Sequence, residues 1–215
     1  MTDPTLVLYH FPGACSQVSL CALEEAGLAY RSELVDLAAN GQGQPGYLAL
    51  SPMGKVPVLV VDGEPLLETA AILTFIATLR PEAKLLPLDA APRLRAEAAG
   101  GLAFCGGTLH PQIRGVANPA RMTTGDLAPV REKSIELAIK SFKFAEHQLA
   151  ERGWWLGEWS IIDVYLDWAF GVAQRAGFDT APFPLLSGLA ERLTVRPSYA
   201  RMLALNAEAR TAQAA

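Results

Sequence analysis

Strand-like and helix-like segments alternate within residues 5–80, whereas no later segment has the pattern of a strand. The expected strands are Leu6–Tyr9, Leu34–Leu37, Val56–Val61 and, after an Asp62-Gly63 turn, Pro65–Leu67. Helical spacing runs over Ser16–Ala26 and over Thr69–Leu79, and a loop is expected over Asn40–Gly46. The order strand–helix–strand followed by strand–strand–helix predicts a small mixed α/β domain.

The rest of the chain is expected to be entirely helical. Arg131–Leu149 has the spacing of an amphipathic helix, and the Ser160–Asp163 segment resembles a capping box at the start of another. Arg196-Pro197 is expected to separate two short final helices. The segment 81–92 contains three prolines and is expected to be a linker. These features predict an α/β domain over 1–80, a linker over 81–92 and an all-helical domain over 93–215.

Composition excludes several classes of protein. The chain is 51% hydrophobic and 19% charged, which excludes intrinsic disorder, and its net charge of −4 gives no basic surplus for a nucleic-acid partner. Three cysteines without CxxC spacing argue against a disulfide framework or a zinc site, so no metal is expected. No apolar run reaches the roughly 18 residues of a membrane span, and Met1–Leu6 lacks the pattern of a secretory signal. We therefore expect a cytoplasmic protein with free thiols.

Four short motifs lie beside the expected strands and helices. Pro12-Gly13-Ala14-Cys15-Ser16 follows the first strand, and Ser51-Pro52-Met53-Gly54-Lys55-Val56-Pro57 precedes the third. Glu68-Thr69 opens the helix that ends the α/β part, and Ser160–Asp163 begins a helix in the second half. In order and spacing the chain resembles the cytosolic glutathione transferases, and most of all the bacterial beta-type group, which contains a cysteine at the site.

The resemblance carries expectations for the whole chain. It implies a thioredoxin-like N-terminal domain followed by an all-helical C-terminal domain, a homodimer, and a role in detoxification. It implies reduced glutathione as cosubstrate and a hydrophobic small-molecule electrophile as partner, with no prosthetic group.

Cys15 is expected at the N-terminus of the first helix. Unpaired N–H groups and the helix dipole stabilise an anion there. Conjugation needs an ionised sulfur near neutral pH, made from a thiol whose pKa is ordinarily about 8.5. Ser16 offers a hydroxyl and a backbone N–H to the same sulfur. Cys15 contacts glutathione or forms a mixed disulfide in this interpretation, and the alternative is that it is a small buried hydrophobic residue. Cys21 and Cys105 are expected in the core.

The other motifs supply the expected glutathione contacts. Val56-Pro57 matches the family's cis-proline turn, which leaves the Val56 backbone groups to pair with the cysteinyl part of the tripeptide. Thr69 and the nearby N–H groups suit the α-carboxylate of the γ-glutamyl part, and Glu68 suits its ammonium group. Lys55 is assigned to the glycyl carboxylate. Ordinary structural roles, a proline at a strand entry and a plain helix cap, are the alternatives for these residues.

His110 matches a beta-type histidine near the electrophile, where it would polarise a leaving group or contact the cysteine. A helix-end histidine satisfied by the backbone is the alternative, and Pro111 stands where members often carry lysine. The electrophile is expected between the two domains, near Phe11 and His110. His10 either lines the site or is buried beneath the first strand.

These residues predict a glutathione transferase that joins the glutathione thiolate to hydrophobic electrophiles. Three alternatives stay open: a thiol–disulfide or reductive reaction through Cys15, a non-catalytic protein that binds glutathione or another ligand, and a glutathione-dependent dehalogenase or isomerase.

Overall fold

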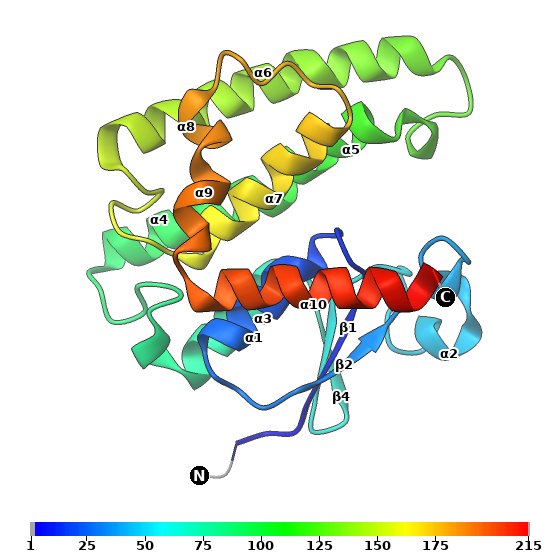
Figure 1. Cartoon of the computed structure of the whole chain (residues 1–215), viewed down its shortest axis with the longest axis vertical. Helices are drawn as coiled ribbons and strands as arrows, with labels where there is room; N and C mark the ends of the chain where they lie inside the picture. Colours follow the sequence, from blue (N-terminus) through cyan, green and yellow to red (C-terminus); the bar gives the residue numbers. More distant parts are fainter. Residues whose placement is uncertain (1–2, 215) are drawn as a thin grey trace. The chain divides into compact units, whose positions relative to one another are not determined.

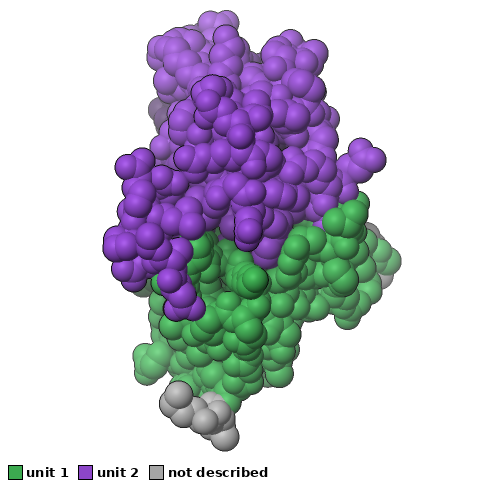
Figure 2. Space-filling model, turned by 90° about the vertical axis from the view of Figure 1, so that its left-hand side faces the viewer, with its two compact units in different colours: residues 1–88, 194–215 green, residues 89–193 purple. Residues whose placement is uncertain are grey.

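The computed structural model describes residues 3–214. The chain forms two compact units, residues 1–88 with 194–215 and residues 89–193, which Figure 2 colours green and purple. Along the chain the elements of the first unit are β1 (Leu6–His10), α1 (Ser16–Glu25), β2 (Arg31–Leu34), η1 (Gly41–Gly43), α2 (Pro45–Leu48), β3 (Val58–Val61), β4 (Glu64–Leu67), α3 (Thr69–Leu79), η2 (Pro81–Ala83) and α10 (Pro197–Ala214).

The first unit is built on a four-stranded sheet in the order β2-β1-β3-β4. β2 is parallel to β1, and β3 is antiparallel to both β1 and β4. The Asp62-Gly63 turn between β3 and β4 has positive φ angles of 50° and 92°, as a tight hairpin requires. This is the thioredoxin-like arrangement expected from the sequence, and Figure 1 shows α1 and α3 beside the sheet.

The sheet carries apolar side chains on both faces because successive residues of a strand point to opposite sides. Leu8 and Leu59 are cross-strand partners and are fully buried. On the other face, Tyr9 and Val58 are partners and pack in a cluster with Tyr47 of α2. The sheet is therefore held between α1 and α3 on one side and the α2 segment on the other.

The last helix belongs to this first unit, although its sequence position suggested the helical half. α10 packs along α1, and Glu25 near the end of α1 bonds to both Arg196 and Ser198. Met202 and Asn206 of α10 are buried. The expected domain limits at 80 and 93 stay a prediction, but the compact unit around the sheet also takes in the C-terminal helix.

The second unit is helical throughout. Its elements are α4 (Pro92–Ala103), the π-helix η3 (Phe104–Leu109), α5 (His110–Ala117), η4 (Pro119–Arg121), α6 (Leu127–Arg152), α7 (Ile161–Arg175), α8 (Pro184–Ser187) and α9 (Leu189–Thr194). α5 packs against α6 and α7, and Phe142 of α6 lies at the centre of a group of aromatic rings. Within residues 3–214 no helix is both long and apolar enough to span a bilayer.

Three local expectations were wrong. The second strand is Arg31–Leu34 rather than Leu34–Leu37 because the Asp36 carboxylate accepts the N–H groups of Ala38 and Ala39 and turns the chain. The segment Asn40–Gly46 is not simply a loop, since it contains η1 and the first turn of α2. The helix after Arg196-Pro197 is also not short, because α10 has 18 residues.

The capping box at the start of α7 is confirmed. Asp163 accepts hydrogen bonds from the backbone N–H groups of Trp155 and Ser160, at 2.8 and 2.9 Å, and from the Ser160 hydroxyl at 3.1 Å. The carboxyl group is fully buried, and this burial raises its pKa to about 6 despite the donors around it.

This pKa predicts a pH-dependent contribution to stability. An aspartate in an unfolded chain has a pKa of about 3.9, so between about pH 4 and pH 6 the folded protein holds a proton that the unfolded chain releases. The stabilising contribution is complete below about pH 4 and is lost as the pH rises through 6. We expect the free energy of unfolding of wild type minus that of Asp163→Asn to fall by about 2 kcal/mol between pH 4 and pH 7. Urea denaturation at several pH values measures it, and a constant difference would contradict the assignment.

Candidate active site

The turn from β1 to α1 is fixed by one serine. The Ser16 hydroxyl accepts the Phe11 N–H at 3.1 Å and donates to the Phe11 carbonyl at 3.2 Å. Ser16 is fully buried, so this side chain closes the turn from inside. Gly13 has a φ of +87°, and a Cβ there would lie 2.9 Å from Nη2 of Arg210 on α10. The positive φ angle therefore favours glycine at this position, whereas the flexible end of the Arg210 side chain could shift away from a Cβ.

The sheet register brings three segments to the same end of the sheet. Tyr9 pairs with Val58, and Val58 pairs with Leu67. The residues just beyond these pairs are the β1–α1 turn, the Val56-Pro57 dipeptide and the Glu68-Thr69 start of α3. The sequence places these motifs far apart, and strand pairing makes them neighbours.

Cys15 occupies the N-cap position of α1, as expected, and is 5% exposed. Its Sγ–H donates to the Val56 carbonyl at 3.4 Å. The Val56-Pro57 bond is cis, which confirms the expected turn. This contact joins the N-terminus of α1 to the cis-proline turn.

A tyrosine that the sequence analysis missed supports the cis-proline turn. The Tyr47 hydroxyl donates to the Lys55 carbonyl at 2.7 Å, and the Ser51 hydroxyl donates to the same carbonyl at 2.9 Å. Burial raises the pKa of Tyr47 to about 12, so its hydroxyl stays protonated and can donate. The Lys55 backbone is therefore held, while its side chain is exposed. Neither the alternation of apolar residues along a strand nor their spacing along a helix indicates this contact.

Glu68 and Thr69 form an unusual helix start. Glu68 has φ +68° and ψ 124°, a conformation that costs a non-glycine residue on the order of 1–3 kcal/mol. Its side chain is exposed, whereas Thr69 is buried. The first N–H groups of α3 have no partner within the helix and are available to an anion. Strained backbone of this kind is concentrated at ligand sites.

The arrangement can hold an extended anionic ligand. Two helix N-termini, at Ser16 and Thr69, offer positive dipole ends. In α1 the N–H groups of Gln17 and Val18 already bond to the Ala14 and Cys15 carbonyls, so less of the backbone is available there than in α3. Val56 lies between them with a backbone edge that a peptide can pair with. Among the described residues 3–214, no three His, Cys, Asp or Glu side chains are grouped as a metal site would require.

The structure favours burial for His10. Its ring is 3% exposed, and burial lowers its pKa to about 4, so the imidazole is neutral. Cys21 and Cys105 are buried as expected, and burial raises the pKa of both thiols, that of Cys21 to about 12. All three are therefore parts of the interior.

His110 lies in the helical unit, at the first residue of α5. It packs edge-on against Trp168, with ring centroids 4.6 Å apart, and its Nε2 lies 3.2 Å from Arg114 Nη2. Phe11 belongs to the other compact unit. A shared electrophile site of Phe11 and His110 therefore stays a prediction.

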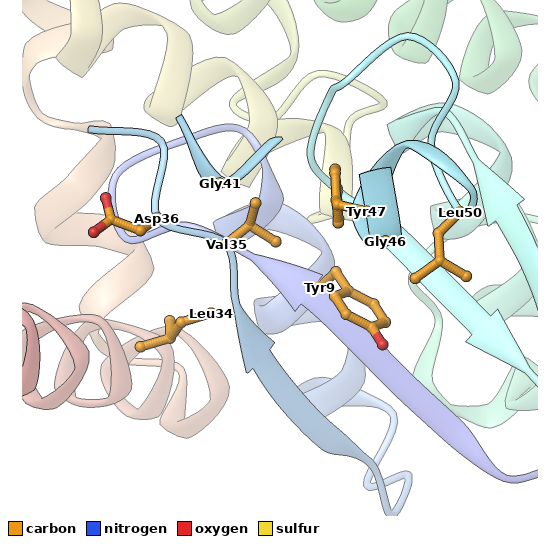
Figure 3. Close-up of a pocket in the computed structure, with 8 residues that line it drawn as sticks. All are labelled: Tyr9, Leu34, Val35, Asp36, Gly41, Gly46, Tyr47 and Leu50. Atoms are coloured by element: carbon orange, nitrogen blue, oxygen red, sulfur yellow. The ribbon is translucent and has the colours of Figure 1, made fainter. Parts of the chain in front are cut away.

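A separate cavity of about 300 Å³ lies near Tyr9 and Tyr47, whose ring centroids are 5.9 Å apart (Figure 3). It is bordered by β1, the end of β2 and the α2 segment. None of the residues expected to bind glutathione lines it. Tyr9 thus faces the α2 side of the sheet.

The Ser16 geometry makes a testable prediction. Ser16→Ala would leave the partly buried Phe11 N–H without its partner, so we expect a loss of about 1–3 kcal/mol in the free energy of unfolding. Ser19→Ala is the matched control on the same helix, because the Ser19 hydroxyl is buried with no hydrogen-bond partner among the described residues. That variant is expected to be neutral or stabilised in urea denaturation. Equal losses in the two variants would refute the structural role of Ser16, whose direct contact with a ligand sulfur stays a prediction.

Comparison with known proteins points to one family. The model of the glutathione S-transferase N-terminal domain matches residues 13–79. The chain is 32% identical over 183 residues to a maleylacetoacetate isomerase of Pseudomonas aeruginosa, covering 83% of this chain and 85% of the relative.

Two solved structures extend the match over both units. A bacterial beta class glutathione S-transferase of Sphingomonas chungbukensis is 30% identical, with a TM-score of 0.82 and coverage of 93% of this chain and 98% of that one. A sphingomonad glutathione S-transferase in complex with glutathione is also 30% identical, with a TM-score of 0.83 and coverage of 94% and 98%. These likenesses confirm the resemblance drawn from the motifs. The chain belongs to the glutathione S-transferase family, among relatives of the bacterial beta class.

Proposed function

We propose that this protein binds reduced glutathione at the sheet end formed by Cys15, Val56-Pro57 and Glu68-Thr69 and joins the glutathione thiolate to a hydrophobic electrophile. The observation that carries the proposal is the register that makes these three motifs neighbours, with Cys15 bonded to Val56. A likeness to a solved transferase that holds glutathione supports it.

Each part of the tripeptide meets a complementary group in this proposal. The γ-glutamyl carboxylate takes the first N–H groups of α3 and the Thr69 hydroxyl, and the ammonium group meets Glu68. The cysteinyl backbone pairs with Val56, and the glycyl carboxylate meets the exposed Lys55 side chain. The sulfur then lies at the N-terminus of α1, where the dipole favours the thiolate.

The chemical step is a displacement. The thiol gives its proton to solvent as the thiolate forms, and the sulfur lone pair then makes a C–S bond with the electrophilic carbon. The leaving group departs with the electron pair of the broken bond. Ser16 holds the turn that presents the α1 terminus, and we propose that its backbone N–H faces the sulfur. His110 would contact the electrophile.

Thr69 offers a direct test of the binding mode. Thr69→Val removes one hydroxyl and keeps the volume, so we expect the Kd for glutathione to rise about tenfold because a hydrogen bond to a carboxylate is lost. Thr74→Val on the same helix is the control, since the exposed Thr74 hydroxyl bonds only to its own helix at the Ala70 carbonyl. Calorimetric titration measures both. Unchanged affinity in Thr69→Val, or an equal loss in Thr74→Val, would refute the assigned carboxylate site.

A glutathione-dependent isomerase is the second candidate, favoured by the relative named maleylacetoacetate isomerase. The thiolate would add to a carbon–carbon double bond conjugated to a carbonyl and push the π electrons onto its oxygen. After rotation about the resulting single bond, the C–S bond breaks and the thiolate leaves. Isomerisation returns glutathione unchanged, whereas conjugation consumes one molecule per turnover. Measuring free thiol during the reaction separates the two.

Substitution of Cys15 distinguishes both of these reactions from a thiol–disulfide reaction. Its thiol donates to a backbone carbonyl and is buried, which suits a contact residue better than an attacking group. We expect Cys15→Ala to retain at least a tenth of the conjugation rate at saturating glutathione. A reductive activity toward mixed disulfides would vanish in the same variant. Loss of conjugation in a variant that still binds glutathione would assign the chemistry to Cys15 itself.

A further inference from the structure

In the helical unit three side chains lie in contact, and the proposed conjugation gives a role to His110 alone. We call His110, Arg114 and Trp168 the α5–α7 cluster. The His110 ring lies against the Trp168 ring at 4.6 Å between centroids, and the Arg114 Nη2 lies 3.2 Å from His110 Nε2. Trp168 is buried, His110 is half-buried and Arg114 is exposed, so polarity increases outward along the cluster.

The contact between Arg114 and His110 joins the two outer members of the cluster. A guanidinium can only donate hydrogen bonds, so this contact is a hydrogen bond in the His110 tautomer that has a lone pair on Nε2. Arg114 is the member of the cluster that always carries a charge.

Arg114 differs from Arg93 and Arg152 of the same unit, which both pair with Glu97. Among residues 3–214 no carboxylate pairs with Arg114. Its remaining N–H donors therefore lack an anionic partner within the unit, and their fork geometry suits a carboxylate.

The chain ahead of α5 is shaped to present this cluster. Pro111 has no N–H and could not donate to the Gly107 carbonyl in a regular α-helix. The backbone instead runs through the π-helix Phe104–Leu109 before α5 begins. Wide helical turns of this kind are frequent at functional sites.

We infer that Arg114 is a specificity-determining residue that selects electrophiles carrying a carboxylate group. The inference rests on the proposed function, in which the electrophile meets His110. The aromatic part of such a molecule would lie toward Trp168 and His110, and its carboxylate would take the outward N–H groups of Arg114. Conjugation itself is unchanged: the thiolate still forms the C–S bond, and the leaving group still departs with its electron pair.

A matched pair of electrophiles tests the inference. A chloronitrobenzoic acid and its methyl ester share the reacting carbon and the chloride leaving group, and differ in the negative charge. The ester group withdraws electrons more strongly than a carboxylate, so the preference of the protein is measured as kcat/KM divided by the rate constant of the uncatalysed reaction with glutathione. On this scale we expect wild-type protein at saturating glutathione to prefer the acid, and the KM for the acid to rise with salt because the charge interaction is screened. In Arg114→Gln, kcat/KM should fall about tenfold for the acid and less than twofold for the ester.

Two further variants keep this test independent of folding. Arg114→Lys keeps the charge and is expected to recover part of the activity toward the acid, whereas Arg95→Gln removes another exposed arginine of the helical unit and should change neither substrate. Equal losses on the acid and the ester in Arg114→Gln, or a wild-type preference for the ester, would overturn the inference while leaving conjugation standing. Failure of wild-type protein to bind glutathione or to consume it with either substrate would instead overturn the proposed function.

Discussion

The two hydrogen bonds between the Ser16 hydroxyl and the backbone of Phe11 set the geometry on which the candidate site depends. They join the first residue of α1 to the residue that follows β1, so the first helix begins close to the end of the sheet. Strand register then places the cis Val56-Pro57 turn and the start of α3 at that same end. Two helix N-termini consequently lie at this end of the sheet with their positive dipole ends, although the Gln17 and Val18 N–H groups of α1 already bond to the Ala14 and Cys15 carbonyls. An anionic peptide-like ligand is the partner that this arrangement suits. The charge preference of the site thus arises mainly from backbone and helix dipoles.

Support for this geometry comes from distant parts of the chain. α10, at the C-terminal end, packs along α1 and is anchored by Arg196 and Ser198 on Glu25. Its Arg210 approaches Gly13 in the turn that leads to Cys15. On the other side, Tyr47 holds the backbone ahead of the cis-proline turn. Residues of α10 and α2 therefore support the turns that form the candidate site.

The sequence predicted elements whose signals are local and missed those that depend on tertiary contacts. α1 and α3 were found with nearly correct limits because their apolar spacing and starts are explicit, and the capping box at Asp163 was recognised for the same reason. β2 was misplaced because an edge strand with mostly exposed side chains has no apolar pattern, while the apolar residues after it lie in an Asp36 turn. The partnership of α10 with α1 and the contact of Arg114 with His110 are visible only in three dimensions.

The central claim is that the glutathione sulfur loses its proton at the N-terminus of α1. It is tested most directly by a pH titration of bound glutathione, isotopically labelled at the cysteinyl Cβ carbon, whose NMR shift reports the ionisation of the adjacent sulfur. The account predicts that the bound thiol is half-ionised at a pH at least one unit below that of the free tripeptide in the same buffer. An unchanged or higher midpoint for the bound ligand would contradict the account, because the helix terminus would then give the thiolate no stabilisation.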